Sequence, residues 1–152
     1  MGLFDGKKKQ EDALMAENEA RARELLDRYN RKELNDAALL KELGKCVILY
    51  TTPIGDTKEG KKRFYLIPGP KPTAYMPVFL NEKEMQDFYE GAGRTAFLIL
   101  KGTLPDLLKV CISENQKDDL NFKYGIMIDP VRYKLTLDAP VLETVRNMII
   151  GG

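Results

Sequence analysis

Apolar and polar residues near the start of the chain recur with the period of an α-helix. Between Glu11 and Tyr29 apolar side chains return every three or four positions, and Asn18 interrupts the stripe that they form. Charged side chains are denser here than in the rest of the chain. We therefore expect a flexible N-terminus over residues 1–10 and a charged helical arm over residues 11–43.

A second, shorter helix is predicted at the end of this arm. Asn35 is a favourable N-cap and Gly44 a favourable C-terminal stop, with Ala37, Leu40 and Leu43 directed inward. Two interpretations of the arm stay open. It is either a solvated helix that lies against the body or a docking surface for another protein.

The body, residues 45–152, begins with three predicted strands. The continuous apolar run at 46–50 is typical of a central strand buried on both faces. Residues 64–67 form the second strand, which would make a long-tipped hairpin with the first. The third strand is expected at 74–80, and Pro77 should place it at a sheet edge or at a bulge, because proline cannot donate to a ladder.

Helices and strands then alternate to the end of the chain. The expected segments are a helix after the cap Asn81, a strand at 95–101, a helix after Thr103, a strand at 122–128, a half-exposed strand through 133–137 and a helix capped by Asp138. This order predicts an α+β fold, in which helices pack on a mixed sheet of five to six strands.

The composition narrows the function classes. The 152 residues include no histidine, which excludes every histidine-based catalytic or metal site. Lysine and arginine number 24 and aspartate and glutamate 23, so the net charge of +1 favours neither nucleic acid nor an anionic membrane as partner. No apolar run suits a signal peptide or a membrane helix. We therefore expect a cytoplasmic protein with reduced cysteines.

Two glycine-rich segments imitate phosphate-binding motifs. Residues 55–62 match most of a P-loop, but Lys62 stands where a magnesium-binding hydroxyl is needed and a strand follows instead of a helix. We interpret this segment as a hairpin tip. Residues 91–96 imitate a dinucleotide fingerprint, but they leave a helix and enter a strand, which is the reverse of the required order. A helix stop is the better interpretation.

No other residues form a recognisable catalytic, metal or cofactor site. Asp118 and Asp119 are adjacent in a polar loop and lack the spacing of a calcium site. Cys46 and Cys111 lie in apolar segments, where a thiol is an inert member of the core. We expect a protein without a cofactor and without catalytic activity.

Aromatic and proline residues gather on the first three predicted strands, namely Tyr50, Pro53, Tyr65, Tyr75, Pro77 and Phe79. They form either core and edge protection or a binding surface, since aromatic residues are favoured at interfaces. The leading hypothesis is a module, monomeric or weakly homo-oligomeric, that binds another protein, helped by an exposed edge at the third strand. The alternative is a small-molecule sensor whose pocket is lined by Tyr50, Tyr65 and Phe79.

Three passages of the body resemble a known family. They are LYTTP at 49–53, YMPVFLN at 75–81 leading into EKEM, and GIMIDP at 125–130. Over residues 45–140 they resemble the N-terminal domain of the bacterial SseB (enhanced serine sensitivity protein B) family. The chain departs from the family pattern at Leu80-Asn81, where a threonine–serine cap is usual, and at Asp129, where asparagine is common.

The resemblance implies a cytosolic bacterial protein without an established enzymatic activity. It also implies that Tyr75, Pro77, Val78, Phe79, Asp129 and Pro130 are fold-defining positions. It transfers no catalytic residues.

Overall fold

The protein is represented by a computed structural model that describes residues 3–51, 54–55, 62–63, 65–94, 97–117 and 122–151, with the backbone alone at 3–8, 54–55 and 62–63. Over these residues the elements are α1 (Leu3–Asn30), α2 (Asp36–Leu43), β1 (Ile48–Thr51), β2 (Ile54–Gly55), β3 (Lys62–Arg63), β4 (Ile67–Pro68), β5 (Thr73–Val78), α3 (Glu82–Gly91), β6 (Ile99–Gly102), α4 (Leu104–Asn115), β7 (Lys123–Ile128), β8 (Leu135–Leu137), the 3₁₀ turn η1 (Ala139–Val141) and α5 (Leu142–Ile150).

A four-stranded mixed sheet with the order β4-β5-β7-β8 forms the centre of the body. The inner strands β5 and β7 run parallel, and both outer pairs are antiparallel. β1 and β6 form a separate antiparallel pair, which joins the sheet through one bridge between Leu49 and Phe79. The predicted α+β fold with a mixed sheet is confirmed.

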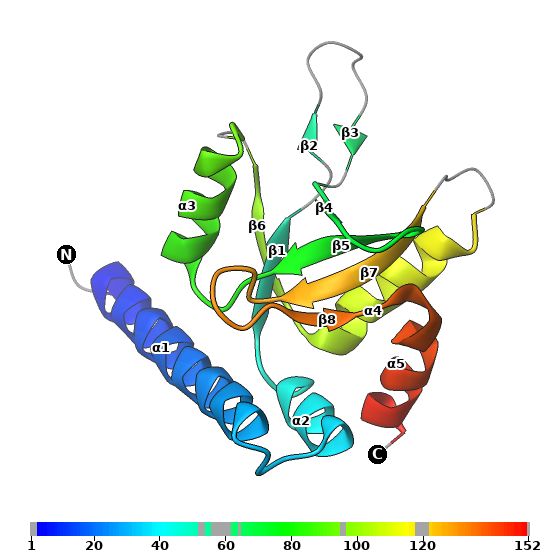
Figure 1. Ribbon diagram of the computed structural model, residues 1–152. Coiled ribbons are helices and arrows are strands. Elements are labelled where there is room, and N and C mark those ends of the chain that lie inside the picture. Colours follow the sequence, from blue (N-terminus) through cyan, green and yellow to red (C-terminus); the bar gives the residue numbers. More distant parts are fainter. Residues whose placement is uncertain are drawn as a thin grey trace.

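Helices surround this sheet, as Figure 1 shows. α4 packs against β7 and α5, and α2 packs against α1 and α5. The arm and the body therefore share one main hydrophobic core, which includes Leu26, Leu39, Leu104, Leu107, Leu108, Ile126 and Ile128. A second, smaller core lies between β1, the end of β5 and α3, and consists of Leu49, Phe79, Met85 and Tyr89.

The charged arm lies against the body. Ala22, Leu25 and Leu26 are buried in the main core, so the apolar stripe is used within the chain. Asn18, which interrupts the stripe in the sequence, donates to Val47 O and accepts from Val47 N–H, each at 2.7 Å. The helix begins at Leu3 and not near residue 11, because lysine, glutamine and leucine in this stretch are good helix formers.

The pairing of the first strands differs from the prediction. β1 pairs with β6 and not with the segment before Pro68, which forms β4 and pairs with β5. The hairpin is made instead by β2 and β3. Strand partners depend on the whole topology, which a local apolar pattern does not encode.

β5 is an internal strand, so the prediction of an exposed edge at residues 74–80 is wrong. β7 covers one side of it, while β4 pairs with Tyr75 and β1 bridges to Phe79 on the other. Pro77 lies between those two contacts and has a partner only on β7, Met127. The sheet thus accommodates proline at a local gap between β4 and β1 and not at an outer edge.

The helix signals were the most reliable. Asn35 caps α2 by accepting from Ala38 N–H at 2.8 Å, and Asn81 caps α3 by accepting from Glu84 N–H at 3.0 Å. In α2, however, Ala37 is exposed and Leu39 is buried in its place. Asp138 makes no side-chain cap, because a 3₁₀ turn precedes α5.

Candidate functional site

The aromatic residues of the proposed pocket do not converge. Phe79 is fully buried in the small core, and Tyr65 packs edge-on against Phe88 and Tyr89 there. Tyr50 follows Leu49 on β1 and therefore points to the opposite face, where it contacts the main core. Pro53 lies outside the described residues. Tyr50, Tyr65 and Phe79 thus do not line one cavity.

Tyr75 and the two prolines of the candidate set are interior residues. The Tyr75 ring lies over two glycines, Gly69 and Gly125, and its hydroxyl donates to Asp138 Oδ1. An added Cβ at Gly125 would lie 2.8 Å from this ring. Pro77 and Pro130 are buried as well. These positions hold the fold together and do not form a binding surface.

Asp129 lies at the carboxyl end of β7, in a polar cluster beneath α1. It is fully buried and adopts a left-handed conformation with φ of 56°. Arg23 of α1 joins three carboxylates there: Nη1 donates to Asp129 Oδ2 at 3.2 Å, Nη2 to Glu84 Oε2 at 2.8 Å and Nε to Glu19 Oε2 at 2.8 Å. One arginine thus connects α1 to both the sheet and α3.

The pKa values of Asp129 and Glu19 in this cluster shift in opposite directions. Burial raises the pKa of Asp129 above its ordinary value, against the opposing effect of Arg23. Asp129 Oδ1 has no hydrogen-bond partner among the described residues. For Glu19 desolvation also raises the pKa, but hydrogen bonds from Asn81 and Arg23 outweigh it, and the pKa is lowered. Of Asp129 and Glu19, Asp129 is the one whose charged form the fold disfavours.

This cluster is best understood as a clasp between the arm and the body. Asn81 Nδ2 donates to Glu19 Oε1 at 2.9 Å, and Tyr133 donates to Asp27 at 2.6 Å, so neighbouring contacts serve the same purpose. Among the residues that the structure describes, no group of three histidine, cysteine or acidic residues could hold a metal ion. Sequence reasoning missed Arg23, because its partners Glu84 and Asp129 are distant along the chain.

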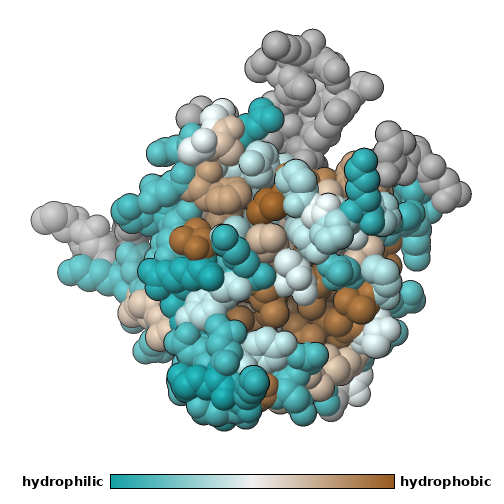
Figure 2. Space-filling view, in the orientation of Figure 1, coloured by the Kyte–Doolittle hydropathy of each residue, from teal (hydrophilic) through white to brown (hydrophobic). Residues whose placement is uncertain are grey.

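An apolar groove opens beside β8. It has a volume of about 420 Å³ and is bounded by the end of α1, by α2, β8 and α5, with the lining residues Tyr29, Asp36, Ala37, Leu39, Leu40, Leu135, Thr136, Leu137, Val141, Thr144, Val145 and Met148. Figure 2 shows hydrophobic surface gathered over β8, between α2 and α5. Val141 on its rim is 43% exposed. The groove is the candidate site that the sequence did not indicate.

The backbone of β8 faces this groove. Lys123 N–H donates to Pro72 O and Asp129 N–H donates to Val78 O, so odd-numbered residues of β7 bond toward β5. The even-numbered residues of β7 therefore bond to Leu135 and Leu137, with which they pair. Thr136 lies between these two and must direct its own N–H and C=O away from β7. Neither group has a partner in the described part of the chain.

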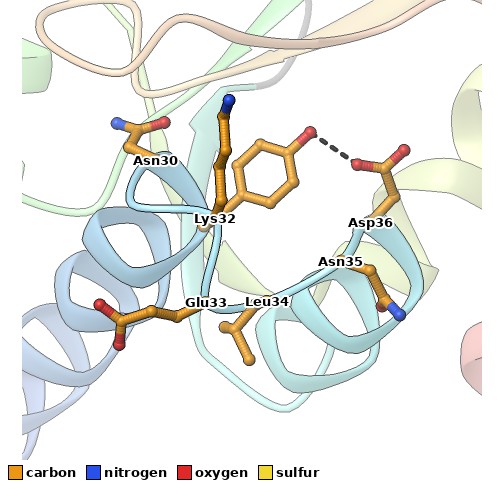
Figure 3. Close-up of a pocket in the computed structure, with 7 residues that line it drawn as sticks. Asn30, Lys32, Glu33, Leu34, Asn35 and Asp36 are labelled. Carbon is orange, nitrogen blue, oxygen red and sulfur yellow. Dashed lines mark hydrogen bonds between the residues drawn. The ribbon is translucent and has the colours of Figure 1, made fainter.

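A polar hollow adjoins the groove at the turn between α1 and α2. Tyr29 and Asp36 line both cavities, and the Tyr29 hydroxyl donates to Asp36 Oδ1 at 2.6 Å between them. Figure 3 shows the Lys32 side chain and the Asp36 carboxylate on one side of the turn, with Glu33 pointing away. Glu33 pairs with Arg28 and Arg31. Asp36 is the only charged residue among those that line the groove itself.

The other candidate residues have structural positions. Cys46 and Cys111 are buried and free, and burial raises the pKa of both thiols, that of Cys111 to about 12. β2 and β3 pair at the two ends of the P-loop-like segment, as the hairpin interpretation predicts. α3 ends at Gly91, as the helix stop predicts, and Gly93 has a φ of 77°. Asp118 and Asp119 lie outside the described residues.

Comparison of the chain with protein-family models, curated proteins and solved structures found no match. No helix in the described ranges combines the length and the hydrophobicity that a membrane crossing needs.

Proposed function

We propose that the chain is a non-catalytic module that binds another protein through the groove beside β8. The observation that carries this proposal is the open backbone of Thr136 at an apolar groove. Edge strands are ready templates for pairing, and proteins usually protect them with charge, proline or a covering segment. Leu135, Thr136 and Leu137 carry none of the protecting side chains, and a groove lies where a covering segment would be.

The proposal includes a family and a location. We propose that residues 45–140 are an SseB-like N-terminal domain of a bacterial cytoplasmic protein. The burial of Tyr75, Pro77, Phe79, Asp129 and Pro130 supports this, because fold-defining positions are expected inside. Because these buried residues are not available to a partner, their burial also supports an interaction surface on another part of the protein.

The same geometry supports a non-enzymatic role. Arg23 pairs with Asp129 at the end of β7 and with Glu19 and Glu84, and both thiols are buried with raised pKa values. Catalytic acids and nucleophiles need access to a substrate, which the fully buried Asp129 and the two buried thiols lack.

Two valines allow a matched test of the groove. Val141 lines it and is 43% exposed, whereas Val131 is 46% exposed and is not among the lining residues. Fragments of the proteome of the organism that encodes the chain would be displayed on phage and selected on the full chain. We expect Val141→Asp to weaken the binding of the enriched fragments at least tenfold. Val131→Asp should leave their binding unchanged. Enrichment of nothing, or fragments indifferent to Val141→Asp, would reject the proposal.

A small apolar molecule is a second candidate occupant. The volume of the groove, about 420 Å³, falls in the range of small-molecule sites. Native mass spectrometry of the full chain would then show a bound molecule that is lost in Val141→Asp and kept in Val131→Asp. A bare mass for the wild-type chain would speak against this candidate.

A further inference from the structure

We infer that the groove takes an extended segment of a partner protein, which adds beside β8 and places a lysine or arginine against Asp36. This inference rests on the proposed function and specifies the chemistry of the partner. Three features of the described residues carry it: the open backbone groups of Thr136, the apolar walls, and the position of the single charged lining residue.

The backbone of β8 selects an extended segment. Thr136 offers one N–H donor and one C=O acceptor on the same side, which is the pattern that an adjacent strand satisfies. A helix consumes its own backbone groups and would leave both Thr136 groups without partners in a surface from which water is displaced. The extended segment is therefore favoured over a helix, although both could fill an apolar groove.

The walls select the side chains of the segment. Among the lining residues Leu39, Leu40 and Val145 are buried, whereas Ala37 of α2, Val141 and the half-buried Met148 of α5 remain accessible, so one face of the added strand meets apolar surface. Successive side chains of a strand point to opposite faces, so the next residue points away from this wall. The segment should thus alternate apolar residues with polar ones.

The charge of Asp36 predicts that the segment carries a cationic side chain near the turn between α1 and α2. Asp36 Oδ1 accepts from Tyr29, whereas no partner bonds to Asp36 Oδ2 among the described residues. A cationic side chain would satisfy this oxygen and complement the only charge that lines the groove. The nearest other acid of the turn, Glu33, is already paired with two arginines.

A second copy of the chain is a poorer occupant. The groove is lined by β8 together with α2 and Tyr29 at the end of α1. In a second copy the edge of β8 is flanked by the same α2 and Tyr29. The sheet of a second copy would have to bring its own α2 and α1 into the same space.

The test uses synthetic peptides made from the fragments that depend on Val141. Replacing each peptide N–H in turn by N–CH₃ should weaken binding at least tenfold at the one position whose N–H bonds to the Thr136 carbonyl, and much less at the two positions beside it, whose N–H groups point away from β8. Asp36→Asn should weaken binding at least tenfold, and Asp36→Lys should shift a fresh selection toward acidic residues. Glu143→Gln, an exposed acid of α5 that does not line the groove, is the control and should have no effect.

The outcomes separate this inference from the proposed function. Peptides that need Val141 but have no N-methylation-sensitive position flanked by tolerant ones, or that are indifferent to Asp36→Asn, would overturn the inference and leave the proposed function standing. Weakening at a spacing of three and four residues would indicate a helix and would overturn it too. Failure to select any Val141-dependent peptide would reject both. Circular dichroism and thermal unfolding of each variant establish that it is folded.

Discussion

Arg23 on α1 donates to the buried carboxylate of Asp129 at the end of β7, across 106 positions of sequence and a distance of 3.2 Å. The same guanidinium also binds Glu19 and Glu84, so one side chain fixes the charged arm to the sheet and to α3. The arm is therefore part of the folded body, and the apolar stripe of α1 at Ala22, Leu25 and Leu26 is used within the chain.

Replacing Arg23 by alanine should destabilise the protein strongly. Asp129 would remain buried without its cation, and breaking such a pair from one side costs about 3–5 kcal/mol. Arg21→Ala is the control, since Arg21 is 58% exposed and pairs with Glu42 at the surface. Its loss should cost at most about 1 kcal/mol. Urea unfolding of both variants measures the difference, and equal effects would show that Arg23 is not the clasp.

Asp129 and Glu19 should contribute to the pH dependence of the stability with opposite signs. The raised pKa of Asp129 means that its contribution is full below the ordinary pKa of 3.8 and is lost as pH rises through the folded value. Asp129→Asn should therefore gain stability relative to wild type as pH rises from about 4 to 7. The lowered pKa of Glu19 means that its contribution is full above 4.5 and is lost as pH falls.

Urea unfolding at several pH values tests both signs. Near neutral pH the Glu19→Gln variant should be less stable than the wild type, and in acid its stability should approach that of the wild type. The stability of Asp129→Asn relative to the wild type should instead rise with pH. Differences from wild type that stay constant with pH would contradict the two shifts.

Asn81→Ala should cost more than Asn35→Ala. Both residues cap a helix, which is worth about 1 kcal/mol, but Asn81 also donates to Glu19 and so supports the clasp. We expect losses of about 2 and about 1 kcal/mol, respectively. Chemical denaturation measures them. If the exposed cap proved the more costly one to remove, the link between α3 and the arm would be unimportant for stability.

Gly125→Ala should destabilise the sheet. A Cβ there would lie 2.7 Å from the carbonyl oxygen of Leu137 and 2.8 Å from the Tyr75 ring, and such overpacking costs about 1–3 kcal/mol. Gly91 is the matched control, because nothing lies within 4 Å of its added Cβ. Gly91→Ala should be neutral or stabilise α3 by up to about 1 kcal/mol. Thermal unfolding compares the two variants, and a stable Gly125→Ala protein would contradict the close packing of Tyr75.

Local signals predicted the helices well because the information lies within a few residues. Asn35 and Asn81 cap the helices that follow them through backbone groups three positions away. Strand partners were harder, because β1 pairs with residues about 50 positions away and the apolar pattern of β1 fits either partner equally. Pro77 indicated a local absence of pairing, which the sequence could not distinguish from an outer edge.

The candidate site was beyond sequence reasoning for a related reason. The groove is assembled from five elements, α1, α2, β8, η1 and α5, and none of its residues is unusual by itself. Val141 follows the predicted cap Asp138, but it belongs to the 3₁₀ turn before α5 and is exposed. Only the three-dimensional arrangement shows that an open strand edge and an apolar wall meet.

Hydrogen exchange of the Thr136 amide in the free protein tests the open edge most directly. NMR would follow the amides of Thr136 and of its neighbours Leu135 and Leu137, which pair with β7. The account predicts that the Thr136 amide exchanges at least about tenfold faster than the other two, since it alone lacks a hydrogen bond. Protection of Thr136 equal to that of its neighbours would mean that the edge is already paired, and the groove could not accept a strand.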